Sequence, residues 1–253
     1  MKYHLLFYIW SIGLLGTVSN AQTNNKNVDL PPEATEQWEP QPRVVKPGEK
    51  DHLPPSDAIV LFDGSNLVHW KSNKTGENPE WIIQDGIVTV NPGSGNLETK
   101  ESYGDVQIHL EWRAPSEIKG EGQGRGNSGL LIMGKYEVQI LDSYQNRTYS
   151  NGQAASIYKE YMPLVNAMRS PQKWNTYDVF FTAPRFNSDG ILMKPAYLTV
   201  IHNGVLVHNH REIKGVTAYI GVHQYKPHPA ELPFQLQDHG NRVSFRNIWV
   251  RKL

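Results

Sequence analysis

Cysteine is absent from this 253-residue chain, and its Lys and Arg residues balance its Asp and Glu residues at 25 each. Without Cys, the protein cannot form disulfides, thiolate zinc sites, iron–sulfur clusters or a cysteine nucleophile. The net charge is zero, so the chain has no excess of Lys and Arg of the kind with which nucleic-acid-binding proteins neutralise phosphates. The sequence therefore predicts neither thiol chemistry nor a nucleic-acid partner.

The apolar run at the start of the chain, from Leu5 to Gly16, is too short to cross a bilayer. It follows Lys2 and precedes small residues that end at Ala21, which is the pattern of a secretory signal peptide. No Cys follows the run, so a lipoprotein anchor at the cleavage site is excluded. We predict a signal peptide over residues 1–21 and no membrane span after its removal. Export without disulfides indicates a bacterial periplasm or the cell exterior.

Seven of the 17 prolines fall between Gln22 and Ser56, where apolar periodicity is almost absent. Proline fixes φ and donates no backbone hydrogen bond, so residues 22–56 are predicted to form an extended linker. The remaining residues, 57–253, are long enough for one hydrophobic core and short for two.

Helical periodicity is also lacking in this predicted domain, whereas two-residue alternation punctuated by turns runs through it. The pattern predicts an all-β, two-sheet sandwich. Asp85-Gly86 and Asn203-Gly204 tolerate positive φ and are predicted to form two hairpin turns. The predicted strands are residues 59–62, 81–83, 87–90, 106–113, 129–133, 136–141, 176–182, 197–202, 205–209, 218–222, 234–237 and 243–251.

Two of these strands carry a polar face opposite an apolar one. In residues 105–113, His109, Glu111 and Arg113 alternate with apolar residues, and in residues 136–142 Glu137 and Gln139 do the same. A solvated outer surface would explain this pattern. The alternative is the floor of a sugar-binding cleft, where carboxylates and amides offer directional hydrogen bonds to hydroxyls.

Ten stretches that occur in order across residues 57–253 carry a family resemblance. They are Leu61–Lys71, Trp81–Gly86, Tyr103–Arg113, Asn127–Gly129, Tyr136–Asp142, Ala155–Tyr158, Trp174–Asn175, His202–Gly204, Leu236–Gly240 and Phe245–Ile248. In these stretches the chain resembles the 3-keto-disaccharide hydrolase family of bacterial exported proteins, which has a concanavalin A-like jelly-roll fold. A jelly roll can also serve as a lectin, so a noncatalytic carbohydrate-binding module is the alternative.

The resemblance implies a 3-keto-glycoside substrate, whose C3 carbonyl acidifies the proton on C2 and permits elimination at C1 followed by hydration. Such a route needs a base, a stabiliser for the enolate and a proton source for the leaving oxygen. Glu137 is the predicted base, although it could instead pair with Arg113. Arg113 or a divalent cation would stabilise the enolate, with Glu111 orienting Arg113 or ligating the metal. His239 is the predicted proton donor, unless it lies in a surface turn.

Further side chains are candidates for binding the substrate carbohydrate. Tyr158 and Trp174 could stack on sugar rings or belong to the core. Asn127 follows a flexible loop and could hydrogen-bond a hydroxyl or carbonyl. The predicted substrate-binding residues are Glu111, His109, Asn127, Gln139, Asp142, Tyr158 and Gln237.

Three further motifs suggest other sites. Glu137-x-Gln139-x-x-Asp142 resembles, more faintly, the acidic strand of laminarinase-type glucanases, but its middle and last residues depart from that pattern. The glycine-rich loop 120–126 leads into a strand rather than a helix, so it is predicted as a mobile lid or rim loop and not a phosphate site. His208-x-His210 has metal-ligand spacing, yet no third ligand lies nearby in sequence, which favours exposed hairpin histidines.

Overall fold

The computed structural model describes residues 30–253, and the chain divides into two compact units between Val44 and Val45. The described residues of the first unit are all exposed and include one 3-10 turn, η1 (Pro32–Thr35). Residues 45–56, which the sequence assigns to the linker, belong to the second unit. The predicted signal peptide lies outside the described residues. Within residues 30–253, no helix has the length and apolar character needed to cross a bilayer.

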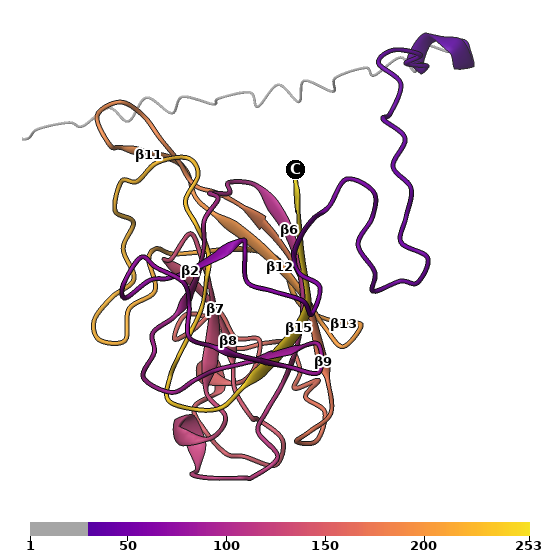
Figure 1. Cartoon of the computed structure of the whole chain (residues 1–253). Coiled ribbons are helices and arrows are strands. Elements are labelled where there is room, and N and C mark those ends of the chain that lie inside the picture. Colours follow the sequence, from indigo (N-terminus) through magenta and orange to yellow (C-terminus); the bar gives the residue numbers. More distant parts are fainter. Residues whose placement is uncertain (1–29) are drawn as a thin grey trace, which may run out of the picture. The chain divides into compact units, whose positions relative to one another are not determined.

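The second unit contains two antiparallel sheets that pack face to face. In Figure 1, β2, β7 and β8 lie on one side and β6, β9, β12, β13 and β15 on the other. The larger sheet has the order β13 (Val205–Glu212), β12 (Tyr197–His202), β9 (Asn175–Thr182), β6 (Val106–Arg113), β15 (Ser244–Lys252), β4 (Ile87–Thr89), β3 (Ile82–Gln84), and β1 (Ile59–Phe62) also pairs with β15.

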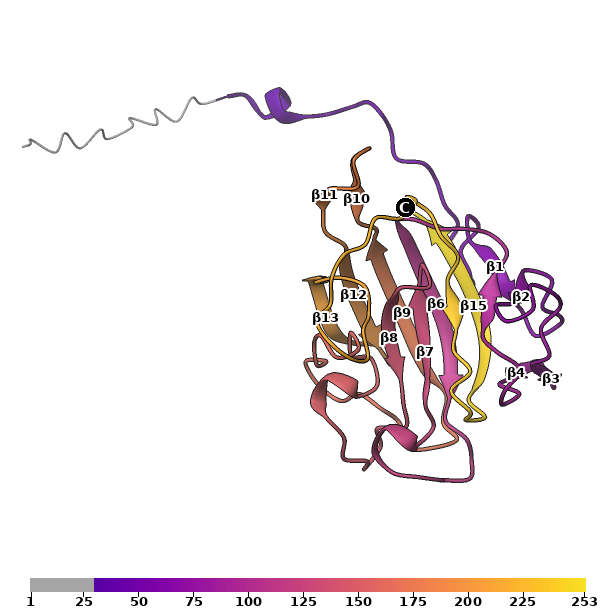
Figure 2. The same ribbon diagram turned by 90° about the vertical axis from the view of Figure 1, so that its left-hand side faces the viewer.

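The smaller sheet carries the outer surface that faces the viewer in Figure 2, where β7 and β8 pass in front of β6 and β9. A separate hairpin and two short 3-10 turns complete the unit. The five-stranded order is β2 (Trp70–Ser72), β5 (Leu97–Thr99), β14 (Gln235–Leu236), β7 (Ser128–Ile132), β8 (Tyr136–Ile140); the hairpin is β10 (Arg185–Phe186) with β11 (Leu192–Lys194), and the turns are η2 (Gly122–Gly124) and η3 (Ser150–Gly152). The prediction of an all-β jelly-roll sandwich is confirmed.

The core lies between the sheets because alternate side chains of each central strand are large and apolar. On β6, Val106, Ile108, Leu110 and Trp112 are fully buried, as the alternation predicts. Aromatic rings fill the space across the core and also place the strands: the hydroxyl of Tyr177 on β9 donates to the backbone carbonyl of Gln139 on β8, at 2.8 Å. A side chain of one sheet thereby holds the backbone of the other in place.

Most predicted strands are present within one or two residues of their predicted ends, and both hairpin turns have the positive φ values that were expected. The strand predicted at residues 218–222 is wrong. Tyr219, Ile220 and Val222 are exposed there, and no neighbouring strand supplies hydrogen-bond partners for an extended run. Strands β2, β5, β10 and β11 were missed because two or three residues are too few to show alternation.

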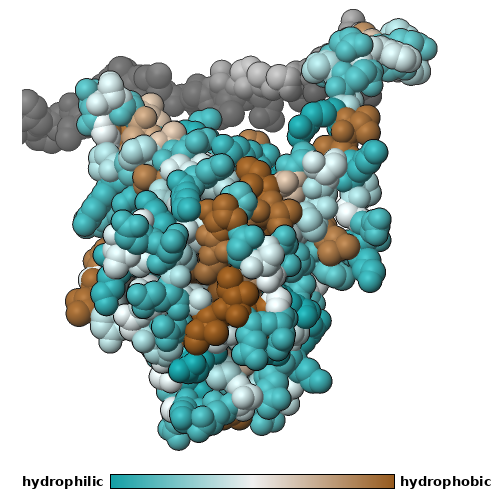
Figure 3. Space-filling view, in the orientation of Figure 1, coloured by the Kyte–Doolittle hydropathy of each residue, from teal (hydrophilic) through white to brown (hydrophobic). Residues whose placement is uncertain are grey.

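The surface differs in polarity from one side to another. Figure 3 shows an apolar band on the side of the molecule seen in Figure 1. A cavity of about 360 Å³ in the second unit has largely apolar walls, including Leu67, Val68, Trp81 and Ile83. By contrast, the outward side chains of the five-stranded sheet include Lys71, Glu98, Gln235 and Glu137, with Leu131 between the last two across the strands. Polar side chains able to bind a carbohydrate thus gather on the outer face of the five-stranded sheet.

Candidate functional site

The predicted site residues separate into groups that the fold holds apart. Glu137 lies on β8 of the five-stranded sheet, whereas Glu111 and Arg113 lie on β6 of the eight-stranded sheet. Because their apolar neighbours in sequence fill the shared core, these polar side chains project outward from opposite sides of the sandwich. The expectation that they converge on one pocket is therefore wrong, and Arg113 does not pair with Glu137.

The polar face of β6 is covered by other parts of the chain. Glu111 accepts hydrogen bonds from Arg246 at 2.7 Å and from Asn247 at 3.0 Å. Asn247 also donates to the carbonyl of His52 at 2.8 Å, which ties the segment before β1 to this face. His109 is 2% exposed and Glu111 is 5% exposed. These two predicted substrate-binding side chains are thus engaged in an internal network, neither solvated nor presented in a cleft.

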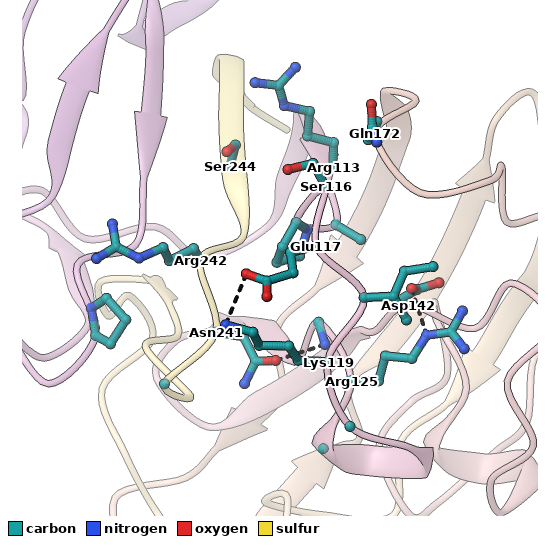
Figure 4. Close-up of a pocket in the computed structure, with 18 residues that line it drawn as sticks. Arg113, Ser116, Glu117, Lys119, Arg125, Asp142, Gln172, Asn241, Arg242 and Ser244 are labelled. Carbon is teal, nitrogen blue, oxygen red and sulfur yellow. Dashed lines mark hydrogen bonds and ion pairs between the residues drawn. The ribbon is translucent and has the colours of Figure 1, made fainter.

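Asp142 lies beside a cavity of about 580 Å³ at one end of the sandwich, shown in Figure 4. Its carboxylate accepts a hydrogen bond from Arg125 at 2.7 Å and is buried with it. Glu117, the other carboxylate of this cavity, pairs with Lys119 at 2.9 Å. Each carboxylate that lines this cavity thus has a cation as a neighbour, and only the Arg125–Asp142 pair is buried.

Arg113 lines the same cavity, and its guanidinium carbon lies 4.7 Å from the centre of the Trp174 ring. Arg246 approaches the same ring at 4.2 Å. Trp174 is thus in contact with two cations, which is a packing role that neither the core nor the sugar-platform prediction anticipated.

Glu137 has the environment expected of a general base. Its side chain is 6% exposed, and no ion pair or hydrogen bond to its carboxylate is found within residues 30–253. Burial raises the pKa of Glu137 to about 7. A carboxyl group with a pKa near neutrality can both accept and return a proton under physiological conditions.

Gly129 provides the space for this carboxylate. It lies on β7 opposite Gln139 of β8, and a Cβ added to it would lie 2.6 Å from Glu137 Oε1. Any larger residue would collide with the Glu137 side chain. The glycine therefore leaves a hollow in the sheet that the carboxylate occupies.

Amide side chains line one side of this hollow. Gln139 donates from Nε2 to Gln123 Oε1 at 2.9 Å, and Asn127 donates from Nδ2 to the Gln123 carbonyl at 2.7 Å. Gln237 is joined to Gly129 by a backbone hydrogen bond, and its Oε1 is buried without a partner among the described residues. The loop around η2, predicted as a mobile lid or rim, is thus anchored on β8 through Gln123.

Two tyrosines line the other side. The backbone N–H of Tyr158 donates to the Glu137 carbonyl at 3.1 Å, and the Tyr158 and Tyr149 hydroxyls lie 2.7 Å apart. Burial raises the pKa of both hydroxyls, and the nearby Glu137 carboxylate adds to the rise. Both therefore keep their protons at neutral pH and can donate hydrogen bonds. Tyr149 was missed because it lies in a loop, where no alternation marks it.

Comparison with known proteins places this fold and its residues in a family. Residues 57–251 match the model of the 3-keto-alpha-glucoside-1,2-lyase-like domain. The chain belongs to this family. The resemblance seen in the sequence is thereby confirmed.

Relatives of this 3-keto-alpha-glucoside-1,2-lyase-like domain include proteins from two bacteria. A 3-keto-disaccharide hydrolase of Bacteroides thetaiotaomicron (strain VPI-5482) is 24% identical over 276 residues, covering 83% of this chain and 85% of that protein. The crystal structure of an inferred glycosyl hydrolase from Parabacteroides distasonis ATCC 8503 is 48% identical, with a TM-score of 0.85, and covers 89% of this chain and 98% of that one. A second structure from that organism, 20% identical with a TM-score of 0.55 over 78% of this chain and 94% of that one, shares the fold.

His239, the predicted proton donor of this family member, is exposed after β14. Its backbone carbonyl accepts a hydrogen bond from Asn241 at 3.2 Å. The preceding Asp238 accepts from the backbone N–H groups of Gly93 and Gly95, which fixes the turn. The structure thus places His239 in a surface turn, the alternative considered from the sequence.

The His208-x-His210 pair does not form a common site. Burial lowers the pKa of His208 to about 4, and its ring is hydrogen-bonded with the Ala155 carbonyl at 2.9 Å. His210 instead stacks on Tyr197, with ring centres 4.3 Å apart. Across residues 30–253, no three or more His, Asp or Glu side chains are grouped so that they could hold a metal ion.

Proposed function

We propose that this protein cleaves the glycosidic bond of 3-keto-disaccharides, with Glu137 as the base. The family and the 3-keto-disaccharide hydrolase of B. thetaiotaomicron support the reaction class. The observation that carries the proposal is the Glu137 carboxyl group, which is buried with no cation paired to it among residues 30–253 and has its pKa raised to about 7. The predicted signal peptide extends the proposal to an exported enzyme.

The chemistry proceeds by elimination and hydration. Glu137 takes the proton from C2, and the electron pair moves into the C3 carbonyl to form an enolate. The enolate re-forms the carbonyl as the bond from C1 to the leaving oxygen breaks, and that oxygen takes a proton from the hydroxyl of Tyr149 or Tyr158. Water then adds its hydroxyl at C1, its proton restores that tyrosine, and the proton held by Glu137 returns to C2. The sum is hydrolysis, giving a 3-keto sugar and a free sugar.

The side chains around Glu137 supply the remaining needs of this route. One of the Tyr149 and Tyr158 hydroxyls donates to the other, and the remaining proton of the pair is the donor for the enolate oxygen or the leaving oxygen. Gln139, Asn127 and Gln237 hold the hydroxyls of the keto sugar. Gln237 is best suited to this task because its buried Oε1 lacks a protein donor within the described residues. Arg113, Glu111 and His239 have no part in the proposed constellation.

The direct test compares two carboxamide variants on a purified 3-keto-disaccharide, with release of the free sugar as the measurement. Glu137→Gln removes the base and is expected to lower kcat by at least about 100-fold. Glu111→Gln, on the opposite sheet, is the matched control and is expected to retain turnover. Retained turnover in Glu137→Gln with loss in Glu111→Gln would move the active site to the other face. In D₂O, deuterium at C2 of the product above the level of a control without enzyme identifies elimination with exchange of the proton held by Glu137.

Two other functions make different predictions. A conventional glucanase would turn over the unoxidised glycan with Asp142 as acid/base, but Asp142 is paired with Arg125. A carbohydrate-binding module would bind the 3-keto-disaccharide without releasing sugar. The same assay, run with the unoxidised disaccharide in parallel, separates all three.

A further inference from the structure

A second cavity of about 580 Å³ adjoins the tyrosine side of the Glu137 site. Tyr149 joins the two, because it lines the cavity and its hydroxyl lies 2.7 Å from that of Tyr158, whose backbone N–H donates to the Glu137 carbonyl. The volume falls within the range of about 300–1,000 Å³ typical of small-molecule sites. The residues that line it are Tyr149, Asn151, Lys159, Glu160, Lys214, Tyr219, Gly221, Val222 and His223.

Two aromatic rings and a cation form one wall of this cavity. The Lys159 ammonium lies 4.1 Å from the centre of the Tyr219 ring and 5.7 Å from that of the Tyr149 ring. It also donates to the Tyr219 carbonyl at 2.6 Å, which holds the loop that carries Tyr219. Aromatic faces beside a fixed donor suit a sugar ring, whose C–H face is apolar and whose rim carries hydroxyls.

Polar groups face the same space without full partners. The ring of His223 is hydrogen-bonded to the backbone of Tyr158, and its Nε2 is buried with no partner among the described residues. Glu160 accepts a hydrogen bond from the backbone N–H of Lys214. A buried polar atom without a partner is costly, which indicates that a ligand or solvent group satisfies it.

Glu137 lies between amide side chains and tyrosine side chains. On the amide side, Gln123 is hydrogen-bonded to Gln139. On the tyrosine side, the site continues past Tyr149 into the cavity. A disaccharide bound with its keto ring on the amides would extend its second ring in that direction.

We infer that this cavity is the binding site for the leaving sugar, the unoxidised ring of the disaccharide, with Tyr219 stacking on it and His223 Nε2 bonding one of its hydroxyls. The inference rests on the proposed function of Glu137. It makes Tyr219 and His223 specificity-determining residues that act on binding of the second ring rather than on the chemical step.

The test measures kcat and KM for two substrates, a 3-keto-disaccharide and the corresponding methyl 3-keto-glycoside, which lacks the second ring. Tyr219→Ala and His223→Ala are expected to lower kcat/KM for the disaccharide about 10-fold each, chiefly through KM. Both are expected to leave the methyl glycoside unchanged. Ile220→Ala, adjacent in sequence and 84% exposed, is the matched control and should alter neither substrate.

A conservative variant separates recognition from folding. Tyr219→Phe keeps the ring and is expected to retain disaccharide activity. Equal losses on both substrates, or no loss on either, would overturn the leaving-sugar site while leaving the proposed function intact. Absence of turnover of both substrates by the wild-type protein would overturn the proposed function and this site with it.

Discussion

Ionisation of Glu137 is expected to weaken the fold, which makes its replacement stabilising at high pH. Burial raises the pKa of Glu137 from 4.5 to about 7, and each pKa unit corresponds to about 1.4 kcal/mol. The native state therefore holds the proton more tightly than the unfolded chain does. Protonated Glu137 therefore contributes about 3 kcal/mol to the free energy of unfolding. This contribution is fully present below pH 4.5 and is lost as the pH rises through 7.

Glu137→Gln keeps the size of the side chain and cannot ionise. The variant is expected to match the wild-type free energy of unfolding at pH 4.5 and to exceed it by about 3 kcal/mol above pH 8. Between these values the difference should grow by up to about 1.4 kcal/mol per pH unit. Glu160, whose pKa burial also raises to about 7, is present in both proteins and cancels from the difference.

Urea unfolding at pH 4.5, 6, 7 and 8.5, followed by intrinsic fluorescence, measures this difference. Glu98→Gln is the control because Glu98 lies on the same sheet face but pairs with Lys71 at 3.0 Å, so its removal should give no gain at high pH. A difference between wild type and Glu137→Gln that does not change with pH would refute the reasoning. So would a variant that is less stable than wild type at pH 8.5.

Three other predictions concern the same sheet. The kcat/KM of the wild-type protein for a 3-keto-disaccharide should rise about tenfold per pH unit below pH 7 and level off above it, because Glu137 must be ionised to accept a proton; a flat pH profile would count against Glu137 as the base. Gly129→Ala should lose most activity and about 1–3 kcal/mol of stability, measured by turnover and urea unfolding, since its Cβ would lie 2.6 Å from Glu137 Oε1; wild-type activity would contradict this geometry. Asp142→Asn should lose about 3 kcal/mol of stability by leaving Arg125 without its carboxylate, yet keep the wild-type pH profile of turnover; a changed profile would place Asp142 in the reaction.

The local sequence pattern was sufficient to predict much of the fold. The alternation over residues 106–113 predicts β6 with its observed ends, and the Asn203-Gly204 dipeptide predicts a turn whose residues have φ of 55° and 79°. The prediction failed at residues 218–222, where an apolar run resembles a strand but has no neighbouring strand to pair with. A strand needs partners that a short stretch of sequence does not contain.

The sequence predicted only part of the candidate site, again because a local pattern does not show which strands pair. Alternation shows that Glu137 and Gln139 share one face and that Glu111 and Arg113 share another, because side chains of a strand alternate between its two sides. It does not show which sheet each strand joins. Tyr149 and Gln123 escaped notice because they lie outside the strands, where no alternation marks them.

The sequence by itself determined the class of fold, the family, the absence of thiol chemistry and the choice of Glu137 as the candidate base. Only the tertiary structure decided that Glu137 lies apart from Arg113 and Glu111, that Asp142 pairs with Arg125, and that two tyrosines lie beside Glu137. Composition and alternation are properties of neighbouring residues, whereas strand pairing between distant segments sets which side chains meet. Burial and the raised pKa of Glu137 follow from that pairing.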